Sequence, residues 1–486
     1  MTPAQYAPEE PVSSIATALA PAALGIVRVS GKNCIELVSK VFSRPRALLE
    51  AAGNTLVHGW IVDKKKDDNQ PVLIDEVMLG VYRAPKSFTG EDMIEIFCHG
   101  GPSVVTAIQS LMLRSGFREA NRGEYTFRAY INGKTDLTRA EAVREIIESR
   151  TDTSRSHAAG RLSGNLFDEI DSIKKLIVDT LAAIEVEIEY PEDEETIADS
   201  FDLADILLAA DRLQTLADSW RGEKLYQDGA RVVLAGRTNA GKSSLFNAIL
   251  KEERAIVSEV EGTTRDWLES WAGINGIPVR LFDTAGLRLT EDVVEARGVE
   301  LSQNLAQSAD LVLYLVDGRF GMCDEDRLFL DGCTKPVIVV STKADMISGA
   351  NRGRCGGEAP AEGVAEDTAA QRGGWSEGET SPSCIRVSSK TSEGLSELFA
   401  RISQILTAGL PTEREQAGLG SARQKDCVLA ALESVRHAIV SADGSYTLDA
   451  VIQDLEDALD NLGEVTGDVT PDDVLGSIFA NFCVGK

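Results

Sequence analysis

The sequence predicts an α/β multidomain protein: a mixed α/β N-terminal domain, an α-helical domain in two stretches, and a P-loop α/β domain inserted between them. Three observations predict this fold class. A strand, a glycine-rich loop and a helix follow one another within residues 231–249, as in a P-loop. Apolar stripes with helical spacing lie on both sides of residues 229–410. With 486 residues, the chain is also too long for one ordinary core.

Composition narrows the class of protein. Hydrophobic residues make up 43% and charged residues 26% of the chain, as in a soluble globular protein. No run of 18 apolar residues exists, so we expect no membrane span. The apolar stretch 15–29 follows Glu9 and Glu10 and contains Pro21, which disfavours a signal peptide and favours a cytoplasmic protein.

Charge and cysteine content argue against two further classes of protein, nonspecific nucleic-acid binders and proteins with zinc or paired-cysteine motifs. A net charge of −28 argues against broad nonspecific binding to nucleic acids, although it leaves a local basic patch open. The eight cysteines show no C-x-x-C pair and no zinc spacing. We therefore expect them to be reduced and mostly structural.

Residues 1–127 contain strand-like runs and a helix that begins near Pro102; the runs are 26–29, 77–82 and 93–97. Residues 128–228 carry helical stripes, the first of which should end at the acidic turn 191–195.

Residues 229–410 have the rhythm of a parallel α/β domain. Its further strands are predicted at 279–282, 311–316, 337–341 and 385–388. Residues 347–383 are poor in apolar side chains, and we expect a mobile surface insertion there rather than a specific role. The helical pattern returns in residues 411–486, and we expect these helices to pack on those of 128–228, because each stretch needs a partner for its stripe.

The loop Gly236–Ser243 matches G-x-x-x-x-G-K-[ST] without a mismatch. Glycines let successive backbone N–H groups and the helix N-terminus face an anion. Lys242 would reach the β- and γ-phosphates, and the Ser243 hydroxyl would ligate Mg²⁺. A chance glycine turn is the alternative, which the strand before and the helix after the loop disfavour.

Further motifs at strand ends indicate which base is bound. Asp283-Thr284-Ala285-Gly286 would hold the magnesium shell and face the γ-phosphate. In Thr342-Lys343-Ala344-Asp345, the last carboxylate can accept N1–H and N2–H of guanine, which adenine lacks. Ser388-Ser389-Lys390 would support the base, and Gly262-Thr263-Thr264-Arg265-Asp266 would act as a switch. Each motif is weak alone, but together in this order they predict guanine specificity.

These motifs resemble those of the Era-like translation-associated GTPases. The flanking segments Ser87–Gly101, Arg122–Ala142 and Phe482–Lys486 resemble a more specific family, the MnmE (TrmE) tRNA-modification GTPases. The similarity spans nearly the whole chain except for 347–383. It implies an N-terminal folate-binding and dimerisation domain (1–127), a discontinuous helical domain (128–228 and 411–486) and an inserted Ras-like GTPase domain (229–410).

The resemblance also implies an activity. The family hydrolyses GTP and, with the FAD-containing partner MnmG (GidA), adds an aminomethyl-type group (carboxymethylaminomethyl) to C5 of the wobble uridine U34 of certain tRNAs. The partners implied are a second copy of the chain, MnmG in a heterotetramer or larger assembly, and tRNA. The one-carbon donor would be 5,10-methylene- or 5-formyl-tetrahydrofolate. Its implied contacts are Arg28, Glu95, Lys134 and Lys486.

A bound K⁺ replaces an arginine finger in this family. Its implied ligands here are Asn239, Ser258, Val260 and Thr263, and those of Mg²⁺ are Ser243 and Thr264. The implied catalytic residues are Lys242, Thr264 and Glu295, of which Glu295 would orient the attacking water. Motifs and resemblance together assign GTP-binding roles to Asn239, Ala240, Gly241, Lys242, Ser243, Ser244, Ser258, Glu259, Val260, Glu261, Gly262, Thr263, Thr264, Asp283, Thr284, Ala285, Gly286, Thr342, Lys343, Asp345, Ser388, Ser389 and Lys390.

Two residues depart from the family pattern. Thr238 stands where proline is usual, and Thr342 stands where asparagine usually ties the guanine-binding loop to the phosphate loop. Loss of that tie would lower nucleotide affinity.

Three residues leave a plainer alternative open. Cys483 is more readily a small buried apolar residue than a reactive thiol. His99 has no second metal ligand at suitable spacing, and Arg265 more readily forms a salt bridge than an arginine finger. The alternative function is a non-modifying Era-like GTPase switch in ribosome assembly.

Overall fold

The computed structural model describes residues 10–64, 71–189, 203–252, 268–283, 307–346, 384–410, 417–443, 448–483 and 485. The chain divides into two compact units. The first unit comprises residues 1–147, 158–218 and 416–486, and the second comprises residues 148–157 and 219–415. The fold is mixed α/β, as the sequence predicts, while the predicted boundaries 127/128, 228/229 and 410/411 stay a prediction.

The first unit contains a six-stranded sheet in the order β3-β4-β5-β2-β1-β6. Its strands are β1 (Val12–Ile15), β2 (Ala22–Ser30), β3 (Thr55–Asp63), β4 (Val72–Tyr82), β5 (Met93–Gly100) and β6 (Arg118–Glu119). Neighbouring strands are antiparallel, except that β1 and β6 are parallel. The predicted strands 26–29, 77–82 and 93–97 lie in β2, β4 and β5.

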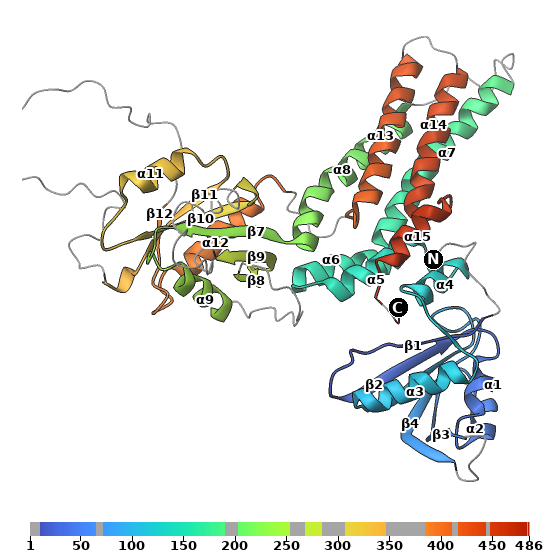
Figure 1. Cartoon of the computed structure of the whole chain (residues 1–486). Helices are drawn as coiled ribbons and strands as arrows, with labels where there is room; N and C mark the ends of the chain where they lie inside the picture. Colours follow the sequence, from blue (N-terminus) through green and yellow to red (C-terminus); the bar gives the residue numbers. More distant parts are fainter. Residues whose placement is uncertain are drawn as a thin grey trace, which may run out of the picture. The chain divides into compact units, whose positions relative to one another are not determined.

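Alternation along β5 explains how this sheet is buried. Ile94, Ile96 and Cys98 lie in the core, whereas Glu95 and His99 point to the opposite face. The helix α3 (Pro102–Arg114) packs against the sheet, and its residues join the same core as those of α1 (Cys34–Ser39) and α2 (Pro45–Leu49) (Figure 1). One face of the sheet is therefore a packed core, and Glu95 lies on the other face.

Besides α1, α2 and α3, the first unit contains further helices that lie in both helical stretches. They are α4 (Glu124–Ile131), α5 (Leu137–Glu148), α6 (Asp152–Ser163), α7 (Asn165–Glu189), α8 (Leu203–Asp228), α13 (Ala422–Asp443), α14 (Leu448–Thr466) and α15 (Asp472–Ala480), with parts of α5, α6 and α8 belonging to the second unit. Helix α14 packs against α13 and α7 (Figure 1). Helices before and after the P-loop region thus pack together, as predicted. The predicted acidic turn 191–195 lies outside the described residues.

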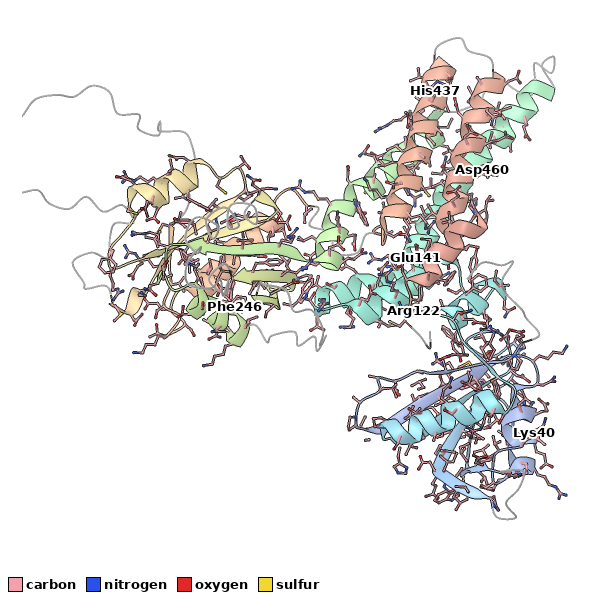
Figure 2. All side chains as sticks on the ribbon, in the orientation of Figure 1. Lys40, Arg122, Glu141, Phe246, His437 and Asp460 are labelled. Carbon is pink, nitrogen blue, oxygen red and sulfur yellow. The ribbon has the colours of Figure 1, made fainter. Side chains whose placement is uncertain are left out.

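A polar cluster also joins the two helical stretches. Glu141 on α5 (Figure 2) accepts hydrogen bonds from Arg423 Nη2 at 2.9 Å and from the Gln424 side chain, both on α13. Arg423 is largely buried, and Glu141 is 9% exposed. Because a buried charge needs a partner, this cluster specifies how α13 docks on α5.

The C-terminal helix α15 lies against α4. Phe479 contacts Phe127 with ring centroids 5.2 Å apart, and Phe482 extends the same cluster. Gly123 has φ +69°, and a Cβ there would lie 2.6 Å from the Phe479 carbonyl oxygen. The close approach requires glycine, and beyond it Gly485 lies against Arg28 of the N-terminal sheet.

The second unit contains a six-stranded sheet in the order β12-β11-β10-β7-β9-β8. The strands are β7 (Ala230–Gly236), β8 (Leu268–Ile274), β9 (Ile277–Asp283), β10 (Leu311–Asp317), β11 (Val337–Thr342) and β12 (Cys384–Arg386). All neighbours are parallel except β8, which is antiparallel to β9. The predicted strands of this region are confirmed, with β12 ending two residues earlier than expected.

Helices cover both faces of this sheet. Residues of α9 (Lys242–Glu252) and α12 (Leu395–Leu406) share one core cluster, which includes Phe246 (Figure 2), and α11 (Asp324–Asp331) packs on the other face. A strand that is buried on both faces has a continuous run of apolar residues, and Leu311–Val316 of β10 is such a run. The carboxyl ends of β7, β9, β10 and β11 meet at one edge, where ligands bind in such sheets.

Candidate functional site

The phosphate loop connects β7 to α9 along a path that needs glycine. Gly236 has φ +136°, and a Cβ there would lie 2.4 Å from the Leu315 carbonyl oxygen on β10. Gly241 has φ +94°, and Asn239 also takes a left-handed conformation with φ 63°. The loop therefore curls tightly between the strand and the helix N-terminus, which is the shape that surrounds a phosphate.

Lys242 lies inside this loop. Its Nζ donates hydrogen bonds to the carbonyl oxygens of Gly236 at 2.7 Å and Arg237 at 2.9 Å. The side chain is buried, and burial lowers the pKa of Lys242 while the nearby Asp283 carboxylate opposes that shift. A cation held within a ring of backbone groups is placed to meet phosphate oxygens.

Ser243 and Asp283 lie together where β9 ends. The Ser243 hydroxyl donates to Asp283 Oδ2 at 2.8 Å. Asp283 is buried at the carboxyl end of its strand, in register with Leu234 of β7. Mg²⁺ prefers a hydroxyl or carboxylate oxygen together with phosphate oxygens and water, so the chemistry of this pair fits that ion.

Thr342 ties the guanine-binding loop to the phosphate loop. Its hydroxyl donates to the Ala240 carbonyl oxygen at 2.6 Å and lies 3.2 Å from that of Val316. The expectation that threonine loses this tie is therefore wrong. Threonine is shorter than asparagine, but Thr342 ends β11 and lies close enough for its hydroxyl to reach the loop directly.

We expect Thr342→Val to weaken GDP binding roughly tenfold, because the variant keeps the shape but leaves the buried Ala240 carbonyl unsatisfied. Titration of a fluorescent guanine nucleotide measures the Kd. Thr407→Val is the matched control, since Thr407 follows α12 directly and its hydroxyl donates to the Ser403 carbonyl of that helix. Equal Kd values for Thr342→Val and wild type would contradict the tie.

The remaining guanine motifs also meet at this edge. The Ser388 hydroxyl donates to Asp345 Oδ1 at 2.8 Å, and the Ala344 N–H donates to the Val387 carbonyl. Ser388 is fully buried, whereas Lys390 is exposed. Asp345 is thus oriented by a second predicted site residue, as a carboxylate that recognises a base must be.

Part of the predicted site lies outside the described residues. This applies to Ser258, Glu259, Val260, Glu261, Gly262, Thr263, Thr264, Arg265, Thr284, Ala285, Gly286, Glu295 and Lys486, and to the insertion 347–383. Their roles stay predictions.

A second cluster lies on the face of the N-terminal sheet that carries Glu95. Arg28 on β2 and Glu95 on β5 are cross-strand partners, and Arg28 Nη2 lies 2.6 Å from Glu95 Oε1. Arg28 Nη1 donates to the carbonyl oxygen of Gly485 at 2.8 Å. Arg28 and Gly485, 457 positions apart in the chain, therefore meet here, and Gly485 lies beside two of the predicted folate contacts.

Two tyrosines support this cluster, and sequence analysis did not identify them. Tyr82 donates to Glu95 Oε2 at 3.3 Å, and burial followed by the Glu95 charge raises the Tyr82 pKa. The buried Tyr125 donates to the Arg28 carbonyl at 2.7 Å, and its ring lies 5.5 Å from the guanidinium. Tyr125 lies within the segment Arg122–Ala142 that resembles the family, and this resemblance is the feature of the sequence that could have identified it.

Three other predicted residues take different places. Lys134 is held by the Pro85 carbonyl at 3.0 Å, so it stays near the loop that precedes β5. His99 Nδ1 lies 2.7 Å from Asp75 Oδ1, in keeping with a satisfied histidine. Cys483 is exposed, so the expectation of a buried thiol is wrong; Phe482 takes the buried position beside it.

Metal-binding clusters, membrane-spanning helices and disulfides are all absent from the described residues. They contain no group of three or more His, Cys, Asp or Glu side chains arranged to hold a metal ion. Among their helices, none combines the length and the apolar character needed to cross a membrane. The seven described cysteines are all free, as expected.

Comparison with known proteins identifies the family. The family model of the MnmE helical domain matches residues 137–483, and that of the GTP-binding protein TrmE N-terminus matches residues 11–134. The chain belongs to the MnmE family of tRNA modification GTPases. It is 48% identical to MnmE of Treponema denticola, with 99% of each chain covered.

Other MnmE proteins are similar from end to end. The chain is 44% identical to that of Treponema pallidum subsp. pallidum, with 99% of each chain covered. It is 37% identical to that of Carboxydothermus hydrogenoformans, over 98% of this chain and all of the relative. The chain is thus a GTPase by family, and its phosphate loop is the candidate place for the GTP of an MnmE protein.

Proposed function

We propose that this protein is a K⁺-stimulated GTPase whose hydrolysis cycle drives modification of the wobble uridine U34 of certain tRNAs. The observation that carries the proposal is the match to MnmE over 99% of both chains, combined with the phosphate loop that holds Lys242 and the contact of Ser243 with Asp283 at the end of β9. The group added at C5 would be carboxymethylaminomethyl, built with a tetrahydrofolate one-carbon donor and the FAD-containing MnmG.

In GTP hydrolysis, the residues of the chain would bind and orient the triphosphate. Lys242 would contact the β- and γ-phosphates, while Ser243 and Thr264 would ligate Mg²⁺. Glu295 would orient the attacking water, because the residue after the DTAG motif is Leu287 rather than a glutamine. Asp345 would recognise guanine and is already hydrogen-bonded by Ser388.

Asn239 would hold K⁺ together with Ser258, Val260 and Thr263. A monovalent cation there would neutralise charge that develops between the β- and γ-phosphates. We expect GTP turnover to be at least about tenfold faster in K⁺ than in Na⁺ at equal ionic strength. Asn239→Ala should lose the K⁺ response and still bind nucleotide. Asn247→Ala, an exposed change on α9, is the control; equal rates in both salts for wild type would exclude the cation mechanism.

The Arg28–Glu95 cluster would bind the reduced folate, with Lys134 and Lys486 as further contacts. A carboxylate can accept N–H groups of a pterin, and cationic side chains suit the glutamate tail of a folate. Arg28 and Glu95 are both about 15% exposed, so their charges are partly shielded from water.

We expect Arg28→Gln to weaken binding of 5-formyl-tetrahydrofolate to the full chain at least about tenfold, because a partly buried charged hydrogen bond is lost. Isothermal titration calorimetry measures this affinity. Arg114→Gln is the matched control, because Arg114 forms an exposed pair with Asp63 in the same unit. If both variants bind folate like wild type, the cluster is not the folate site.

The proposed assembly is cytoplasmic. It comprises a homodimer of this chain with MnmG, in a heterotetramer or larger complex, and a tRNA substrate. The decisive experiment is nucleoside analysis of tRNA from cells that lack this protein. Loss of the modified wobble uridine, restored by wild type but not by Lys242→Ala, supports the proposal. Unchanged tRNA would favour the alternative, an Era-like GTPase switch in ribosome assembly.

A further inference from the structure

Asp317, at the carboxyl end of β10, contacts a residue of the guanine-binding loop. It is in register with Thr342 at the end of β11. Its Oδ2 accepts a hydrogen bond from Lys343 Nζ at 2.7 Å, and the same ammonium donates to the Asn239 carbonyl at 2.9 Å. One lysine thus connects the end of β10, the guanine-binding loop and the phosphate loop.

Lys343 is held in an unfavourable backbone conformation. Its φ is 58°, in the left-handed region that non-glycine residues seldom adopt. Such a residue persists when its surroundings define it strongly. Three contacts define the surroundings of Lys343. The Thr342 hydroxyl donates to the Ala240 carbonyl of the phosphate loop, and the Ala344 N–H donates to the carbonyl of Val387, the residue after β12. Asp317 accepts a hydrogen bond from the Lys343 side chain.

Asp317 is itself oriented by Arg319. Arg319 donates its backbone N–H and Nε to Asp317 Oδ1, both at 3.0 Å, and its Nη2 to Oδ2 at 2.7 Å. These bonds, and then those from Lys343, hold the pKa of Asp317 well below its usual range, against the effect of burial. The carboxylate is 13% and the lysine 27% exposed, so the pair is less screened than a surface pair.

We infer that Asp317 is a positioning residue for nucleotide binding, which acts by holding Lys343 on the carbonyl of Asn239. This inference rests on the proposed function, because it assigns Asn239 and Lys343 to the nucleotide site. Asp317 thereby couples the part of the site that reads guanine to the part that holds phosphate and K⁺. Without its charge, Lys343 is free to leave the phosphate loop, and Asn239 loses a contact that fixes its left-handed conformation.

The test is Asp317→Asn in the full chain, which removes the charge and keeps the size. We expect the Kd for GDP to rise about tenfold. The K⁺ concentration for half-maximal GTP turnover should rise as well, a change that a merely structural role would not cause. Glu269→Gln is the matched control, because it removes an acid paired with Arg280 at 2.7 Å on the same sheet. Wild-type values for Asp317→Asn in both measurements overturn the inference.

A double-mutant cycle establishes the route through Lys343. In a Lys343→Gln background, Asp317→Asn should change the Kd by less than about twofold. A full additional tenfold loss shows that Asp317 acts elsewhere and overturns the inference. If Asp317→Asn fails to fold by circular dichroism, Asp317→Glu takes its place. We then expect the Asp317→Glu chain to bind GDP more tightly than the Lys343→Gln chain. If Asp317→Glu binds GDP more weakly than Lys343→Gln, the inference is overturned.

Failure of this inference and failure of the proposed function give different results. If wild type neither binds GDP nor hydrolyses GTP, the proposed function fails. If wild type does both and the Asp317→Asn chain matches it, only the positioning role of Asp317 fails.

Discussion

Replacing Lys242 by alanine will reduce GTP turnover by about a thousandfold or more. The ammonium lies within the phosphate loop, 2.7 Å from the Gly236 carbonyl, and is buried. In the proposed function this cation contacts the phosphates, so its loss would remove charge stabilisation where negative charge develops during hydrolysis. The Lys242→Ala loop should keep its backbone path, because Gly236 and Gly241 determine that path.

Release of inorganic phosphate under K⁺, with saturating GTP, measures this loss. Lys251→Ala is the matched control, since Lys251 lies on the same helix and is exposed. Thermal unfolding of both variants separates a catalytic loss from a folding defect. A Lys242→Ala protein that is folded and retains a tenth of wild-type turnover would show that the loop is not the GTPase site.

Replacing Glu124 by glutamine will destabilise the first unit by about 3 kcal/mol, because it leaves a buried arginine without its closest charge. Glu124 and Arg128 both have fully buried side chains, with Arg128 Nη2 2.8 Å from Glu124 Oε1. Arg118 Nη2 lies 2.6 Å from the same oxygen. Arg128 also binds Glu91 at 3.0 Å, and this anchors the segment before β5 that leads to Glu95.

Urea unfolding followed by circular dichroism measures this effect, with Glu36→Gln on the exposed face of α1 as control.

The pH dependence of this stability difference is a second test. Burial raises the Glu124 pKa, but the hydrogen bonds from Arg118, the Asn121 N–H and Arg128 outweigh it, so the pKa is lowered. A lowered pKa contributes stability above the ordinary glutamate value, and this stability is lost as the pH falls through the folded value. The difference between Glu124→Gln and wild type should therefore shrink in acid; a constant difference would contradict an ionised Glu124.

Most of the nucleotide fold could be predicted from local pattern. The apolar runs of β7, β9, β10 and β11 and the loop Gly236–Ser243 need only their own residues to be recognised, because strand burial and tight turns restrict residue type locally. The segments Thr342–Asp345 and Ser388–Lys390 were located for the same reason. The short strand β1, the edge strand β3 and the helices α1 and α2 were not predicted, since their burial depends on the sheet that they join.

The supporting residues were harder to predict. Asp317 follows an apolar strand and precedes a glycine, which in sequence is an ordinary strand end. Glu124 and Arg128 lie in the family-like segment Arg122–Ala142, but no local pattern there predicts that both charged side chains are buried. Cys483 reads as a small apolar residue until Phe482 takes the place in the core.

The family, the order of the guanine motifs and the two helical stretches that flank them could all be predicted from the sequence. How those parts support one another is visible only in the folded chain. Thr342 meets Ala240 across 102 residues, Lys343 meets Asp317 across 26 residues, and Arg28 meets Gly485 across 457 residues. Such pairs leave no local pattern, because a hydrogen bond depends on where two strands or a chain end come together in space and not on the residues beside each partner.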